Sequence, residues 1–165
     1  MRPSENGTRP QGAGITGFDY RAATPEQRSA LKKRIREAAS RGDVPVGALV
    51  IRDGVVVGRG CNRREQDCDV TAHAEMQSIT AAASMLGGKY LKGCTLYVTV
   101  EPCVMCGGAI AWSQMGRVVY GAPDAKRGYS TYSERIMHPK TEVTVGVLQE
   151  ECEALMKRFF ADLRK

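Results

Sequence analysis

The sequence predicts a layered α/β fold in which helices pack on a mixed β-sheet. Three observations support this class. Segments with helical periodicity alternate with short apolar segments of strand character, glycines and prolines separate the two kinds, and no internal repeat is visible. The 165 residues are typical of one domain, and an apolar fraction of 42% is enough to bury a single core. We therefore expect one domain over residues 24–165.

The first 23 residues are expected to form a mobile tail, because they contain four glycines and two prolines and show no apolar period. Thr24 then starts a helix. Pro25 takes its first helical position, and Gln27 lies three residues after the Thr24 cap. Gly42 ends this helix, whose buried face carries the recurring apolar residues Leu31, Ile35, Ala38 and Ala39.

The next elements are a hairpin and a second helix. Ala48–Ile51 and Val55–Val57 are short apolar runs, and the Asp53-Gly54 pair between them is typical of a tight turn. The second helix is expected from His73 to Leu86, where Gly87-Gly88 ends it.

The remaining elements complete the sheet. Thr95–Val100 is rich in strand formers and lacks polar alternation, as a buried central strand would. A helix is expected over Cys103–Ser113, with Trp112 in the core, and a strand over Val118–Tyr120. Alternating valines from Val143 to Val147 predict the last strand. The final helix carries an apolar stripe that we expect to pack in the core, formed by Leu148, Cys152, Leu155, Phe159 and Leu163.

Composition and charge narrow the function only slightly. The net charge of +6 is compatible with a polyanionic partner but does not establish one. The chain has no run of about 18 apolar residues and no apolar stretch of the kind a secretion signal needs, so we expect a cytoplasmic protein without a membrane span. In a reducing compartment, cysteines are expected as thiols or metal ligands. Four of the six are interpreted as small buried hydrophobes: Cys61, Cys68, Cys94 and Cys152.

The other two cysteines form a candidate zinc site with a histidine. Cys103 and Cys106 are three residues apart in the first turn after Pro102, so their sulfurs share one helix face. Unpaired backbone N–H groups and the helix dipole favour thiolates there. His73 opens another helix and would supply a third ligand. A catalytic zinc site uses three protein ligands and water, so we predict one Zn²⁺ per chain.

Glu75 is the candidate catalytic base. Two thiolates and a neutral imidazole cancel the charge of zinc, so the ion polarises water less than one held by neutral ligands, and a nearby base would help. Two alternatives remain. A redox Cys-x-x-Cys would leave His73 and Glu75 unexplained. A closed structural zinc site would need a fourth ligand, for which Cys94 is the nearest spare thiol in sequence.

Both motifs resemble those of the zinc-dependent nucleobase deaminases. The runs Thr71–Glu75 and Glu101–Cys106 match their His-x-Glu and Pro-Cys-x-x-Cys signature. The wider resemblance, from about Pro45 to Phe160, is to the bacterial tRNA adenosine deaminases, although Val70 stands where that family usually has proline. It implies a cytidine-deaminase-like three-layer fold, with helices on both faces of a five-stranded mixed sheet.

The same resemblance implies a function and a substrate site. The reaction would be hydrolytic deamination of adenosine to inosine at the wobble position of a tRNA anticodon, with the anticodon stem-loop as partner and a homodimer as the assembly. Asn62 would hydrogen-bond the nucleoside, the Ala74 backbone would contact the purine, and Val46 would line the pocket. Asp124 and Lys126 would lie beside the flanking nucleotides.

Simpler roles and other functions remain open. Asn62 could cap a turn, and Asp124 could shape the turn after Pro123. The whole chain could instead deaminate a free base or nucleoside of the guanine or cytosine type. It could also be a non-catalytic zinc-binding module.

Overall fold

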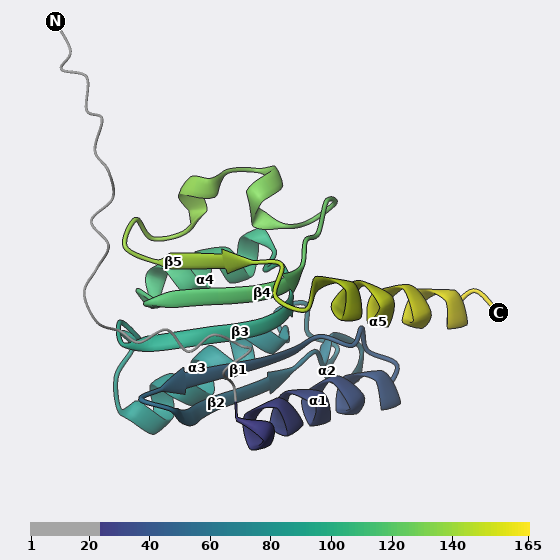
Figure 1. Cartoon of the computed structure of the whole chain (residues 1–165), viewed down its shortest axis with the longest axis horizontal. Helices are drawn as coiled ribbons and strands as arrows, with labels where there is room; N and C mark the ends of the chain where they lie inside the picture. The colour runs from purple at the N-terminus through teal and green to yellow at the C-terminus, as the bar shows by residue number, and fades with distance from the viewer. Residues whose placement is uncertain (1–23) are drawn as a thin grey trace, which may run out of the picture.

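The computed structural model describes residues 24–165, and the tail expected over residues 1–23 lies outside them. The described residues surround a five-stranded sheet of order β2-β1-β3-β4-β5 (Figure 1). β1 is antiparallel to both β2 and β3, whereas β3, β4 and β5 run parallel, so the sheet is mixed as predicted. The strands are β1 (Gly47–Arg52), β2 (Val55–Cys61), β3 (Cys94–Val100), β4 (Arg117–Ala122) and β5 (Glu142–Val145).

The longer helices begin and end where local signals place them. At the start of α1, Thr24 and Gln27 form a capping box, in which the Gln27 N–H donates to Thr24 Oγ1 at 3.2 Å. Gly87 ends α3 in the left-handed conformation, with φ of 68°. The helices are α1 (Pro25–Ser40), α2 (Arg64–Asp67), α3 (Ala74–Leu86), α4 (Val104–Trp112) and α5 (Gln149–Asp162), with 3₁₀ turns η2 (Tyr129–Thr131) and η3 (Glu134–Ile136).

Two apolar clusters on opposite faces of the sheet create three layers. The larger cluster joins Val50, Leu96 and Val118 of the strands to residues of α3 and α4, Ala82 and Ile110 among them. The neighbouring strand residues Ile51, Tyr97 and Val119 point to the other face and form the second cluster. That face carries α1 and the start of α5 (Figure 1). The three-layer fold with a five-stranded sheet is therefore confirmed.

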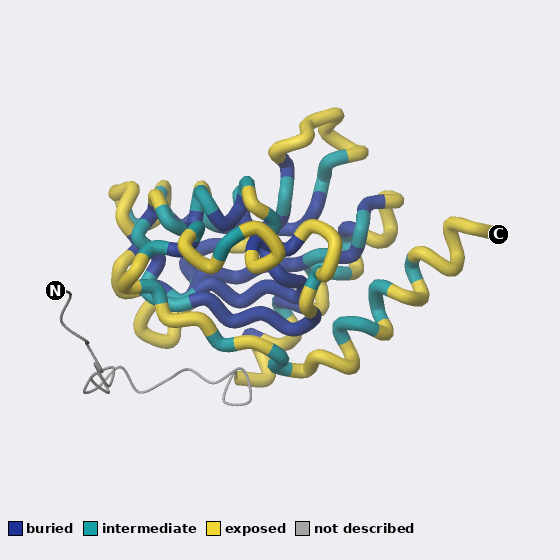
Figure 2. Tube along the Cα trace, turned by 90° about the horizontal axis from the view of Figure 1, so that it is seen from above, coloured by how far each residue is buried: buried dark blue, intermediate teal, exposed yellow. Residues whose placement is uncertain are grey.

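The apolar stripe of α5 does not lie in the core, so that prediction was wrong. None of the residues of α5 is buried, and Leu163 just beyond its end is 63% exposed. The helix runs outward past the edge of the sheet (Figures 1 and 2), and only its start reaches β4. Helical spacing predicts an amphipathic face, but it does not say whether a surface lies opposite that face.

Two other core assignments were also wrong. Trp112 is 85% exposed, because it ends α4 and Ile110 and Met115 occupy the buried side there. Cys68 is exposed at the C-cap of α2, where its backbone adopts the left-handed conformation. Of the remaining interpreted hydrophobes, Cys61 and Cys94 are buried and Cys152 is half-buried.

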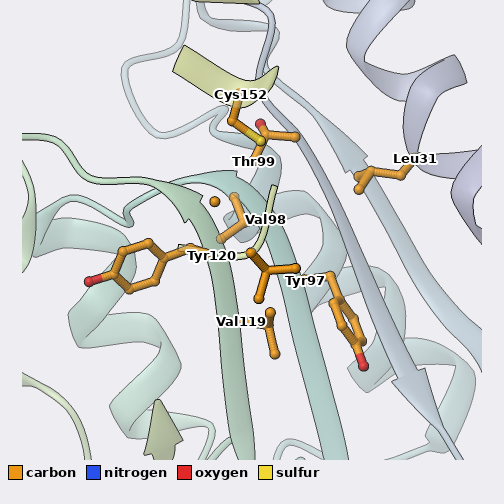
Figure 3. Close-up of a pocket in the computed structure, with 9 residues that line it drawn as sticks. Leu31, Tyr97, Val98, Thr99, Val119, Tyr120 and Cys152 are labelled. Carbon is orange, nitrogen blue, oxygen red and sulfur yellow. The ribbon is translucent and has the colours of Figure 1, made fainter. Parts of the chain in front are cut away.

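A small pocket lies between α1, the sheet and α5 (Figure 3). Leu31, Tyr97, Val119 and Cys152 are among the residues around it. Its volume of about 20 Å³ is room for about one water molecule, so it is not a substrate site. Within residues 24–165, no helix is both long and apolar enough to cross a membrane.

Candidate active site

The topology brings the two signature motifs to one edge of the sheet. β2 and β3 point the same way, because β1 is antiparallel to both. α3 follows β2 after the short helix α2, and α4 follows β3, so both helices begin near the carboxyl ends of these strands. His73 is the N-cap residue of α3, and Cys103 is that of α4. Neither side chain caps its own helix, which leaves both able to meet at the helix ends.

The geometry of the cluster suits zinc. The Nδ1 atom of His73 lies 3.4 Å from the Cys106 sulfur and 3.7 Å from the Cys103 sulfur. All three ligand atoms lie within 4.8 Å of one another. With zinc–sulfur bonds of about 2.3 Å and a zinc–nitrogen bond of about 2.0 Å, a tetrahedral ion needs a sulfur–nitrogen separation of about 3.5 Å.

The electrostatics of the cluster also favour a cation. The pKa of Cys103 is lowered to about 4, chiefly by its hydrogen bond with Cys106 and also by that with His73. The pKa of Cys106 is raised, because its thiol donates to Cys103 and because it is buried. One thiolate therefore forms readily, and the second requires additional positive charge. A divalent ion supplies that charge, so the donor set fits zinc.

The spare thiol Cys94 does not complete a closed metal site. It is the first residue of β3, whereas Cys103 follows the last residue of that strand. The seven-residue strand is about 20 Å long at about 3.3 Å per residue, and Cys103 comes three residues after its last residue, so the two cysteines lie at opposite ends of β3. Among residues 24–165, the group suited to a metal contains only His73, Cys103 and Cys106. An open coordination position is what a catalytic zinc site requires.

Glu75 lies beside this cluster in the first turn of α3, and it is only 4% exposed. Burial is the main cause that raises the pKa of its carboxyl to about 7. A backbone hydrogen bond and the nearby His73 oppose that rise. A buried carboxyl that titrates near neutrality can both accept and return a proton.

Two glycines of β2, neither of them predicted as a site residue, fix the position of α3. A Cβ at Gly58 would lie 2.2 Å from the Ser78 carbonyl oxygen, and one at Gly60 would lie 2.0 Å from that of Ala74. The start of α3 therefore packs directly on the strand backbone. Alternate glycines within a strand pattern were the available signal, since they often mark close backbone approach.

The three residues predicted to contact the nucleoside border the same edge. Val46 precedes β1 and Asn62 follows β2, and the Asn62 N–H donates to the Val46 carbonyl oxygen at 3.0 Å. Ala74 is fully buried in the first turn of α3. The Asn62 side chain also accepts from the Arg64 N–H at 3.4 Å. The turn-capping role left open for Asn62 is thus present, and its contact with substrate stays a prediction.

Asp124 and Lys126 lie on the loop that follows β4. The Asp124 Oδ1 atom accepts the backbone N–H groups of Lys126 and Arg127, each at 3.0 Å, so Asp124 does shape a turn. Lys126 is exposed at an open pocket. The pocket is lined by residues of this loop and of the α4 start: Cys103, Val104, Met105, Lys126, Arg127 and Tyr132. The loop thus flanks the metal cluster, and the substrate contacts of Asp124 and Lys126 stay predictions.

Comparisons with known proteins agree with this arrangement. The chain matches the MafB19-like deaminase family over residues 26–164. It is 43% identical to the tRNA-specific adenosine deaminase of Bacillus subtilis (strain 168) over 139 residues, which cover 81% of this chain and 86% of that protein.

Two solved structures have a similar fold. One comes from a study of A-to-I editing by tRNA:A34 deaminases at the wobble position of transfer RNA. It matches with a TM-score of 0.72 and 35% identity, over 80% of this chain and 99% of that one. The guanine deaminase from Nitrosomonas europaea matches with a TM-score of 0.74 and 26% identity, over 90% of this chain and 94% of that one.

Proposed function

The chain belongs to the family of the tRNA-specific adenosine deaminases, and we propose that it converts adenosine to inosine at the wobble position of a tRNA anticodon. The observation that carries this proposal is the His73, Cys103 and Cys106 cluster beside the buried Glu75. A catalytic zinc site with a proton-transfer group next to it is what hydrolytic deamination requires.

The reaction consumes one water and releases one ammonia from C6 of the adenine. His73, Cys103 and Cys106 would hold the zinc, one ion per chain. When bound, the ion supplies Lewis acidity, which makes a water molecule a better nucleophile. Glu75 takes a proton from the attacking water and delivers it to the ring nitrogen, then assists departure of the amine as ammonia. Its buried position excludes bulk water from these transfers.

An RNA loop is the substrate that the site entrance favours. The target base must leave its stack to reach a buried site, which costs least in a single-stranded loop. Val46, Asn62 and Ala74 would surround that base, and Lys126 beside Asp124 would meet the flanking nucleotides. The open pocket with Lys126 and Arg127 at the α4 start suits a polyanion better than a free base.

The alternative of a free-base deaminase has less support, although the fold itself does not argue against it. The TM-scores of 0.72 and 0.74 do not separate the two activities. The 43% identity to the tRNA-specific adenosine deaminase of Bacillus subtilis, over 81% of this chain, supports the tRNA activity. We further propose that the catalytic domain covers residues 24–165, that the protein is a homodimer, and that it works in the cytoplasm, where it would meet tRNA.

A substrate panel tests the proposal. Zinc-loaded protein is incubated with an anticodon stem-loop carrying adenosine at the wobble position, with free adenosine, and with free guanine and cytosine, and ammonia is measured. We expect turnover of the stem-loop far above that of the free compounds. Turnover of guanine or cytosine without turnover of RNA would establish the free-base deaminase instead. A protein that keeps zinc but releases no ammonia from any of them would be a binding module.

A further inference from the structure

Glu101 is a buried carboxylate that the mechanism above does not use. It lies between the end of β3 and Cys103, and it is only 5% exposed. Its Oε2 atom accepts the Asp124 N–H at 2.9 Å, and its Oε1 atom accepts the Ser130 N–H at 3.0 Å. One carboxylate therefore holds both ends of the 124–130 loop. Within residues 24–165 no ion pair includes it, so these loop amides stabilise its charge.

The loop is shaped around this carboxylate at Gly128. A Cβ at Gly128 would lie 2.3 Å from the Glu101 carboxyl carbon and 2.4 Å from its Oε2 atom. The φ of Gly128 is −58°, a value that any residue adopts. Glycine is thus required here for space and not for backbone conformation. An alanine at this position would push against the carboxylate from the loop side.

Backbone contacts join the same loop to the metal-binding segment. The Tyr129 N–H donates to the Pro102 carbonyl oxygen at 2.9 Å, and Cys103 and Gly128 form a β-bridge. The two basic residues of the pocket, Lys126 and Arg127, lie between the two amides that Glu101 holds. Glu101 therefore sets where these cations stand relative to Cys103.

We propose that Glu101 is a positioning residue for the RNA substrate. By holding the 124–130 loop, it fixes Lys126 and Arg127 at the mouth of the site, where they meet substrate phosphates. This inference rests on the function proposed above. Contacts made by the loop are present both before and during the reaction, so loosening the loop raises KM and leaves kcat nearly unchanged.

Two substitutions perturb this contact from opposite sides. Glu101→Gln keeps the shape of the side chain but places an amide donor against one of the loop N–H groups. Gly128→Ala instead crowds the carboxylate, and its Cβ would also lie 2.6 Å from the Asp124 carbonyl oxygen within the loop. Loss of a hydrogen bond to a charged group typically costs a factor of about ten or more, so we expect KM for the anticodon stem-loop to rise at least about ten-fold. We expect kcat to stay within about three-fold and zinc to remain bound in both variants.

The matched controls are Glu142→Gln, an exposed carboxyl on β5, and Gly88→Ala, whose added Cβ meets no atom within 4 Å. Neither control should change KM. Amide hydrogen exchange measures the contact between Glu101 and the loop independently of catalytic activity. Exchange at residues 124 and 130 should accelerate in both Glu101→Gln and Gly128→Ala, and stay at the parent rate in the controls.

Several outcomes would overturn the proposal. An unchanged KM in both Glu101→Gln and Gly128→Ala would remove the substrate role. Loss of zinc or of kcat at constant KM would mean that Glu101 supports the metal ligands and not the loop. A parent protein inactive on RNA contradicts the function proposed above and removes the substrate role with it. Hydrogen exchange then still decides whether Glu101 holds the loop, and unchanged exchange at residues 124 and 130 would refute that as well.

Discussion

A single methyl group on β2 should displace the catalytic end of α3. In Gly60→Ala the new Cβ would lie 2.0 Å from the Ala74 carbonyl oxygen and 2.9 Å from the Ser78 nitrogen, both backbone atoms. Ordinary contacts begin near 3.4 Å, so the first turn of α3 must retreat by about 1 Å or more. Rotation of a flexible side chain does not relieve this overlap, because both atoms belong to the helix backbone.

The effect on the site should exceed the effect on stability. Overpacking of this kind typically costs about 1–3 kcal/mol of unfolding free energy. Metal–ligand distances tolerate only about 0.2 Å, and His73 moves with α3 because it is the N-cap residue of that helix. A displacement of about 1 Å in a catalytic group can lower the rate by about 10²-fold. We therefore expect Gly60→Ala to remain folded but to bind zinc weakly and to lose most turnover.

The assay compares Gly60→Ala with Gly88→Ala, because Gly88 has open space around its missing side chain. Zinc affinity is measured by chelator competition, stability by denaturant unfolding, and rate by single-turnover deamination of a stem-loop. The control should match the parent in all three. A Gly60→Ala protein with parental zinc affinity and rate would refute the claim that β2 sets the position of α3.

The remaining predictions concern the site itself. Removing the Cys103 and Cys106 thiols together, by alanine substitution, should abolish zinc binding in elemental analysis, and full occupancy would mean that the metal site is wrongly assigned. Glu75→Gln should keep zinc and fold but lose about 10²- to 10⁴-fold in turnover, and a loss of only a few-fold would contradict its role as base. Asp124→Asn keeps the Oδ1 acceptor of the turn but removes the negative charge. A smaller ratio of RNA to DNA deamination rates on matched hairpins would therefore show that the charge acts on the ribose 2′-OH. An unchanged ratio would mean that Asp124 only shapes the turn.

Local signals in the sequence were sufficient for the elements whose ends depend on nearby residues. The Thr24 capping box and the Gly87 helix end appear as predicted. The hairpin turn at Asp53-Gly54 has positive φ at both residues, which its composition indicated. The exposure of Trp112 and the incomplete burial of the α5 stripe depend on which surface lies opposite, and periodicity contains no such information.

The residues of the candidate site were likewise predicted only where the signal was local. The spacing of Cys103 and Cys106 and the helix-start position of His73 were enough to predict a three-ligand cluster. Gly60 and Glu101 were missed, because their roles depend on contacts with residues 14 or more positions away. Such contacts are visible only once the strands and helices are assembled.

Detection of inosine in the product RNA is the most direct test of the proposed deamination at the wobble position. The zinc-loaded protein of residues 1–165 is incubated with a tRNA that carries adenosine at the wobble position, and the RNA is sequenced for inosine while ammonia is measured. The claim predicts inosine at that position, one ammonia released per inosine, and neither product with Glu75→Gln. An absence of inosine from a protein with a full zinc site would contradict it, as would inosine spread evenly over the adenosines of the tRNA.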